Sequence, residues 1–104
     1  MSTVILTARD PLSAGDTTHP VRTATDLARN GEHVTLVLFE DAVTLTRLGH
    51  HHLEVLVGAL DAGVRVLVER DARDRRAVVP VDGVEVATMD AVADLLDADR
   101  SVWL

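Results

Sequence analysis

Short apolar runs separated by longer amphipathic or polar stretches divide the chain, and they predict its strands. The clearest run covers residues 34–39, where only Thr35 interrupts the apolar side chains between a turn glycine and two carboxylates. A run that is apolar on both faces fits a strand covered by helices on both sides of a parallel sheet. The other predicted strands cover residues 3–8, 64–68, 84–88 and 101–104.

The stretches between these runs carry helical signals. Thr17 or Thr18 can cap a first helix, which Asn30-Gly31 ends. Residues 41–48 predict a short helix, and residues 69–76 are a charged stretch at the carboxyl end of the third predicted strand. Two later helices have apolar faces at helical spacing: Leu53, Leu56, Val57 and Leu60 in one, and Met89, Val92, Ala93 and Leu96 in the other, which Thr88 can cap.

Strands that alternate with helices predict parallel pairing through right-handed crossovers. We therefore expect residues 1–104 to form one flavodoxin-like α/β domain with about five mostly parallel strands and helices on both faces.

Composition removes several classes of function. The chain has 104 residues, a formal net charge of -7 and 2% aromatic residues, which argues against direct nucleic-acid binding. It has no cysteine, so thiolate chemistry, Cys-ligated zinc and iron–sulfur clusters are excluded for the chain alone. No apolar run approaches the roughly 18 residues of a membrane span, and no signal pattern opens the chain. We expect a cytoplasmic protein without membrane contact or cofactor.

Polar residues cluster where the predicted parallel strands end, at the edge where open α/β sheets bind ligands. The candidate ligand-binding residues are Asp10, His19, Glu40, Asp41, Glu69, Arg70 and Asp71. Glu40 or Asp41 could act as a general acid or base, or Asp41 could simply cap a helix while Glu40 is solvated. The arginines of residues 70–76 could hold a phosphate or carboxylate, or form a solvated loop of salt bridges with the interleaved acids.

Three consecutive histidines suggest metal binding, but consecutive helical residues point about 100° apart and cannot all bind one ion. Only His50 with Glu54, or a histidine joined by His19 or Asp41, could form part of a site, and we expect no bound metal. An exposed helix start or a packed subunit contact is the alternative. The candidate interface residues are Phe39, His50, His51, His52 and Trp103.

Several segments resemble a known family. Residues 31–43 (GEHVTLVLFEDAV) look like the second-strand signature of the DsrE/DsrF/DsrH superfamily of sulfur-relay proteins. Residues 63–68 and 83–89 resemble its third and fourth strands. The tripeptide Asp41-Ala42-Val43 and the segment Val102-Trp103-Leu104 are most similar to the DsrH/TusB-like branch.

The resemblance implies a five-stranded α/β fold, trimeric or hexameric rings, and persulfide transfer toward tRNA 2-thiolation or within dissimilatory sulfur oxidation. Catalytic members carry a cysteine just after the third strand, where this chain has residues 69–72 (ERDA). We therefore expect a non-catalytic, self-associating scaffold or subunit, with a cysteine-bearing DsrE-family chain as a possible partner. The alternative is a stand-alone small-ligand-binding protein or weak enzyme with a polar site at the carboxyl edge of the sheet.

Overall fold

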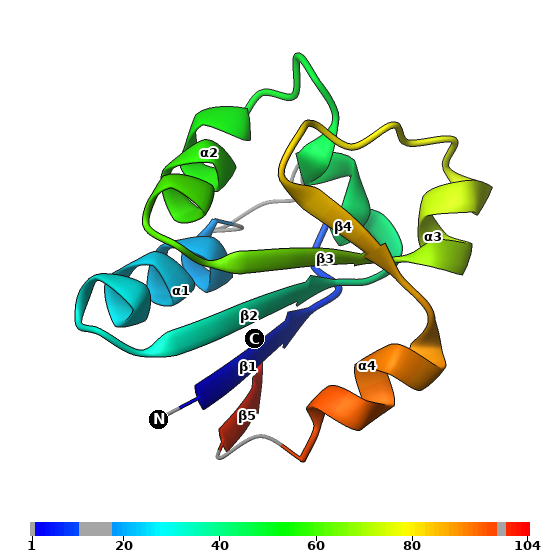
Figure 1. Ribbon diagram of the computed structural model, residues 1–104. Coiled ribbons are helices and arrows are strands. Elements are labelled where there is room, and N and C mark those ends of the chain that lie inside the picture. Colours follow the sequence, from blue (N-terminus) through cyan, green and yellow to red (C-terminus); the bar gives the residue numbers. More distant parts are fainter. Residues whose placement is uncertain (1, 11–17, 98–99) are drawn as a thin grey trace.

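The computed structural model describes residues 2–10, 18–97 and 100–104. They form a five-stranded sheet in the order β4-β3-β2-β1-β5, and every neighbouring pair is parallel (Figure 1). The strands are β1 Ser2–Thr7, β2 His33–Leu38, β3 Arg65–Glu69, β4 Val84–Ala87 and β5 Arg100–Trp103. The predicted flavodoxin-like α/β fold is confirmed.

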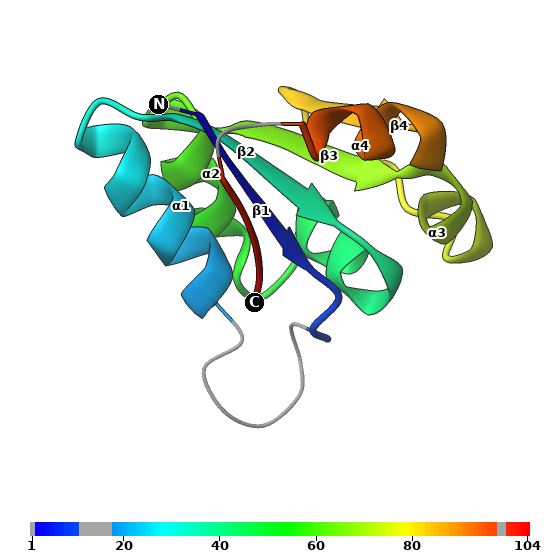
Figure 2. The ribbon, with the colours of Figure 1, turned by 90° about the horizontal axis from the view of Figure 1, so that it is seen from below.

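Helices cover both faces of the sheet, but unequally. They are α1 His19–Arg29, the 3-10 helix η1 Glu40–Thr46, α2 Leu53–Asp61, α3 Arg70–Arg75 and α4 Met89–Leu95. Figure 2 shows α1 and α2 on one side of the sheet and α4 on the other. The strand order explains this, because right-handed crossovers that advance in one direction all lie on one face. The chain advances from β1 to β4 on the α1 face and returns from β4 to β5 across the opposite face.

The α1 face carries the larger core. Ile5, Leu36 and Val66 come from three neighbouring strands and pack in one buried cluster with residues of α1, η1 and α2. Leu36 is fully buried. Apolar side chains at alternate strand positions make this face, as the period of two requires.

The α4 face carries a smaller cluster. Val4, Leu6, Val37 and Leu67 lie on this side of the sheet and pack with Val92 of α4. Since α4 has seven residues, about two turns, it covers only part of the face.

In α4 and α2, the residues that face the sheet differ from those predicted. In α4, Val92 is buried and Leu95 is partly buried, whereas Met89 and Leu96 are 53% and 47% exposed. Packing on a helix of two turns uses the i, i+3 pair, so the longer predicted stripe never meets the sheet. In α2, Leu56 and Ala59 are buried while Val57 points outward and is 41% exposed.

Two other elements differ from the prediction in kind. Residues 40–46 form a 3-10 helix where an ordinary short helix over residues 41–48 was expected. The charged stretch contains a true helix, α3, although its one buried residue is Ala72. A helix with so little apolar content has no periodic signal, and a cap rather than a hydrophobic stripe fixes its start.

The predicted helix ends are largely confirmed. Asn30 and Gly31 end α1, and Gly31 has the positive φ of +89° that glycine favours. The Thr88 hydroxyl accepts a hydrogen bond from the Ala91 N–H at 3.2 Å and so caps α4. Thr18 occupies the N-cap position of α1 without a side-chain cap bond, and Thr17 lies outside the described residues. None of the helices in the described part of the chain has the length and apolarity needed to cross a bilayer.

Candidate functional site

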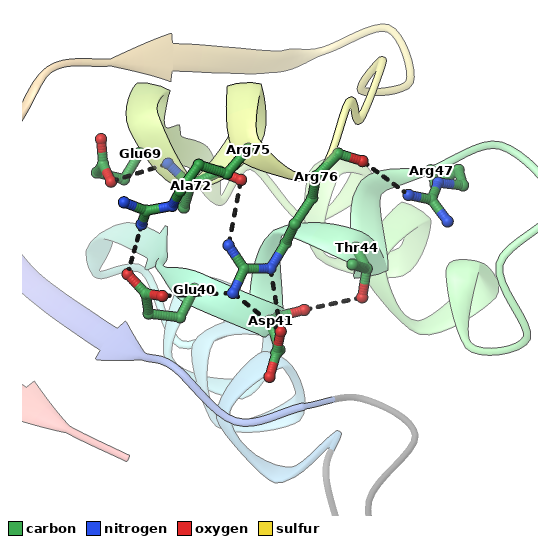
Figure 3. A network of polar contacts seen from close by, with 8 residues as sticks. All are labelled: Glu40, Asp41, Thr44, Arg47, Glu69, Ala72, Arg75 and Arg76. Carbon is green, nitrogen blue, oxygen red and sulfur yellow. Dashed lines mark hydrogen bonds and ion pairs between the residues drawn. The ribbon is translucent and has the colours of Figure 1, made fainter.

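The parallel sheet brings polar side chains from two strand ends together at its carboxyl edge. Glu40 and Asp41 follow β2, and Arg75 and Arg76 end α3, which follows β3. Arg75 donates to Glu40 at 2.9 Å, and Arg76 donates to Asp41 at 3.0 Å and to Glu40 at 3.3 Å (Figure 3). These four residues form what we call the carboxyl-edge network.

The network is fixed to the backbone on both sides. The Arg76 guanidinium also donates to the Ala72 carbonyl at 3.4 Å, and Arg47 donates to the Arg76 carbonyl at 3.3 Å. The hydroxyl of Thr44 donates to the Asp41 carbonyl at 2.8 Å. The network therefore joins η1 to α3.

Glu40 has a positive φ of +46°, which an L side chain rarely adopts. The backbone around it is held, because the Phe39 N–H donates to the Thr7 carbonyl and the Ala42 N–H donates to the Phe39 carbonyl. The left-handed turn begins η1 directly after the strand, and its carboxylate faces the arginines of α3.

The charges of the network balance, with two carboxylates against two guanidinium groups. The hydrogen bond to Asp41, together with the Asp41 and Glu40 charges, raises the pKa of Arg76 above its ordinary value. Each of the two carboxylates is held by a hydrogen bond from a guanidinium group. The arrangement fits a structural clamp better than a general acid or base, and the predicted capping role of Asp41 is wrong because Phe39 holds the N-cap position.

Glu69 is the buried end of β3 and is 5% exposed. Its carboxylate accepts hydrogen bonds from the Asp71 N–H at 2.5 Å and the Ala72 N–H at 3.1 Å. The side chain thus caps α3 and satisfies two backbone donors that the first turn would leave unpaired. Arg70 and Asp71 are exposed on that first turn.

His50 is the partly buried member of the histidine run. Its Nδ1 accepts a hydrogen bond from the His52 N–H at 3.0 Å, so the neutral ring carries its proton on Nε2. Nε2 is buried and has no hydrogen-bond partner among the described residues. Burial, and then the neighbouring His52, Arg47 and His51, lower the pKa of His50, while the nearby Asp10 opposes them.

The remaining predicted residues lie elsewhere. His19, the first residue of α1, lines a groove of about 330 Å³ between α1 and β5, together with Ile5, Leu27, Val102 and Leu104. Within the described residues, no group of three or more histidine, aspartate and glutamate side chains could hold a metal ion.

The order of the strands reverses at β1, because β2 lies on one side of β1 and β5 on the other. Open α/β sheets usually bind ligands at the carboxyl ends of the strands at such a position. Here the protein bridges that position itself, because the Arg9 guanidinium donates to the Leu104 carbonyl at 2.6 Å. Phe39 and Trp103 stack beside it with ring centroids 5.5 Å apart.

The two aromatic residues differ sharply in exposure. Phe39 is 8% exposed and lies beneath Trp103, which is 65% exposed. Of the predicted interface residues, Trp103 is therefore at the surface of the α4 face, whereas Phe39 supports it from below. The stack joins the ends of two strands far apart in sequence.

The structure brings together some of the predicted ligand-binding residues but not all of them. Glu40 and Asp41 do meet basic residues of the 69–76 stretch, but their partners are Arg75 and Arg76 instead of Arg70. Arg70 lies at the start of α3 and Arg75 at its end, so identifying the partners of Glu40 and Asp41 required knowing that residues 70–75 form a helix. Asp10 lies near enough to His50 for its charge to act on the pKa of that histidine.

No protein-family model and no curated protein matches the sequence. Solved structures match the fold along nearly all of the chain. The ychN protein from E. coli superimposes with a TM-score of 0.87 at 23% identity and covers 100% of both chains. BT1422 from Bacteroides thetaiotaomicron, a conserved protein of unknown function, gives 0.81 at 17% identity over 99% of this chain and 94% of its own.

A third match is MTH1491 from Methanobacterium thermoautotrophicum, also a protein of unknown function. It has a TM-score of 0.72 at 12% identity and covers 97% of this chain and 96% of its own. At these identities the matches establish the α/β fold.

Proposed function

We propose that this chain is a non-catalytic, self-assembling member of the DsrE/DsrF/DsrH superfamily, serving as a scaffold or subunit of a sulfur-relay complex. The observation that carries the proposal is Glu69, which ends β3 and caps α3, next to the place where the resemblance puts a catalytic cysteine. Its carboxylate is committed to two backbone N–H groups.

A carboxylate cannot take up a sulfane sulfur as a persulfide, and the chain contains no cysteine. In such a complex the sulfur-carrying step belongs to a cysteine-bearing partner, and this chain contributes fold and surface. The ion pairs at the carboxyl edge support this role, because the carboxylates of Glu40 and Asp41 bind arginines of the same chain instead of a ligand.

The surface of the α4 face supports assembly. A parallel sheet normally has both faces covered, and here one helix of about two turns covers the second face. Trp103 is 65% exposed there, and exposed aromatic residues of this kind are typical anchors of protein interfaces. A second copy of the chain is the partner we expect at Trp103.

Native mass spectrometry and light scattering of the purified chain test the proposal. We expect an oligomer that Trp103→Gln weakens by at least about tenfold in dissociation constant, equivalent to about 1.4 kcal/mol. Leu48→Gln is the matched control, because Leu48 is 80% exposed and lies beside Val79 and Pro80, toward the opposite edge of the sheet. Circular dichroism establishes that both variants keep the fold.

Two results would overturn the proposal. One is a wild-type chain that stays monomeric at all concentrations and binds no cysteine-bearing α/β protein. The other is a small ligand that raises the melting temperature of the wild-type chain but not of Asp41→Ala. That second result would identify a ligand-binding protein with its site at the carboxyl edge.

A further inference from the structure

The outer side of β5 offers an open backbone edge. The strand order places β5 at the end of the sheet, and in the described part of the chain no strand pairs with its outer side. All four of its residues are exposed. Lysine, proline and bulges, which usually protect such an edge, are absent from these four residues.

The hydrogen bonds to β1 show which backbone groups are free. The Leu104 N–H donates to the Leu6 carbonyl at 2.9 Å, so Leu104 faces inward. Because backbone groups alternate along a strand, Val102 and Arg100 also face β1, while the N–H and C=O groups of Ser101 and Trp103 face outward.

We propose that β5 pairs antiparallel with β5 of a second copy of the chain, which joins two sheets into one of ten strands. This inference rests on the self-assembly in the proposed function and specifies its contact. A two-fold axis through Val102 places Ser101 opposite Trp103 of the copy, and Trp103 opposite Ser101 of the copy. Each of these two pairs exchanges two N–H···O bonds, so the four outward groups of each strand are all satisfied.

The side chains favour the same register. Val102 lies opposite Val102 of the copy in a non-hydrogen-bonded pair, the closest kind of pair in an antiparallel ladder and one that suits β-branched residues. On the α4 face, the small Ser101 lies opposite the large ring of Trp103 in both pairs. The edge is therefore complementary to itself, which argues for a second copy over an unrelated strand.

The strand is short, so its four hydrogen bonds act together with apolar surface on each side. On the α4 face that surface is Trp103, which stacks on Phe39. On the other face it is the groove of about 330 Å³ between α1 and β5, lined by Val102 and Leu104. A two-fold contact also requires an even number of subunits, so a dimer or hexamer fits and an isolated trimer does not.

Ser101→Pro tests the pairing directly. The Ser101 N–H faces away from β1, so proline removes no hydrogen bond inside the subunit but blocks the outer edge. We expect Ser101→Pro to weaken association at least about tenfold by light scattering, while Ser101→Ala, which keeps the N–H, assembles like the wild type.

Amide hydrogen exchange of the wild-type chain gives a readout that needs no variant. We expect the Ser101 and Trp103 amides to exchange at least about tenfold more slowly in concentrated than in dilute protein. The Leu104 amide, bonded within the subunit, is the internal reference and should change little.

The outcomes separate this inference from the function on which it rests. An oligomer that survives Ser101→Pro, dissociates with Trp103→Gln and leaves the Ser101 and Trp103 amides unprotected overturns the edge pairing and leaves self-assembly standing. An odd number of subunits also overturns the pairing alone. A monomer whose edge amides become protected only when a cysteine-bearing α/β protein is added assigns the edge to a different partner and overturns pairing between copies.

Discussion

The two faces of the sheet differ in how they are covered and in what they leave at the surface. On the α1 face, three crossovers pack against the strands, and Leu36 and Leu38 are fully buried. On the α4 face, a single crossover covers the strands, and Trp103, Met89 and Leu96 are between 47% and 65% exposed. The first face provides most of the core, and the second leaves apolar surface for a partner.

This division follows from the topology. The return from β4 to β5 must pass three intervening strands, about 19 Å at 4.8 Å per spacing, whereas a helix of seven residues is about 10 Å long. One short helix cannot fill that face, and all four residues of β5 remain exposed. The strand order thereby determines where apolar surface is left over.

The largest expected effect comes from removing the same side chain from each face. Leu36→Ala should lower the free energy of unfolding by about 4 kcal/mol, because helices fixed above Leu36 leave a cavity. Leu67→Ala on the α4 face should cost about 2–3 kcal/mol, since the lone α4 can settle into the space. Urea unfolding at one fixed protein concentration measures both losses. Equal losses would show that α4 holds its face as rigidly as the three crossovers hold theirs.

The next effect compares the caps of the helices at the ends of β3 and β4. Glu69→Ala should lower stability by about 1–2 kcal/mol, because two N–H groups of α3 lose their acceptor near a buried position. Thr88→Ala at the start of α4 should cost about 1 kcal/mol or less, since it removes a single exposed bond. Thermal unfolding ranks the two variants, and a larger loss for Thr88→Ala would contradict the ranking.

His50 makes the loop before α2 sensitive to acid. Its pKa is lowered in the folded chain, so below the ordinary value of about 6.5 the unfolded chain binds more protons than the folded one. This contribution to stability is complete above that value and is lost as the pH falls through the lowered folded pKa.

The comparison uses His50→Asn, whose side-chain oxygen can still accept the His52 N–H bond but does not titrate. We expect urea midpoints of the wild type to fall more steeply between about pH 7 and pH 5 than those of His50→Asn. His51→Asn changes an exposed member of the same run and is the control. Identical slopes for the wild type and His50→Asn would exclude this role of His50.

The smallest effect concerns the carboxyl-edge network. Arg76→Ala removes the ion pairs to Glu40 and Asp41, so we expect a small loss of stability that shrinks as salt is added. Arg65→Ala removes a single exposed pair with Glu85 and should change the urea midpoint even less. A loss for Arg76→Ala that salt does not reduce would point to packing of its side chain instead of charge.

The strands β1, β2 and β3 could be predicted because each contains a short apolar run, and parallel strands buried on both faces leave that pattern. The meeting of Glu40 and Asp41 with arginines of the 69–76 stretch was also accessible, because parallel strands end at one edge. Helix α3 was not accessible, since its start depends on the Glu69 cap and its core contact on Ala72 alone. The stack of Phe39 on Trp103 requires the strand order, which no local pattern contains.

The pairing of β1 with β5 has a consequence for how the chain folds. Thr3 and Arg100 bond across these two strands although 97 positions separate them in the sequence. Pairing over such a long separation is entropically costly and is expected late in folding. Until β5 arrives, the backbone of Val4 and Leu6 remains open on the side that β5 later covers. The last strand thus covers the backbone of the first. A protease that removed β5 would turn β1 into an edge strand whose unpaired N–H and C=O groups could pair with another chain.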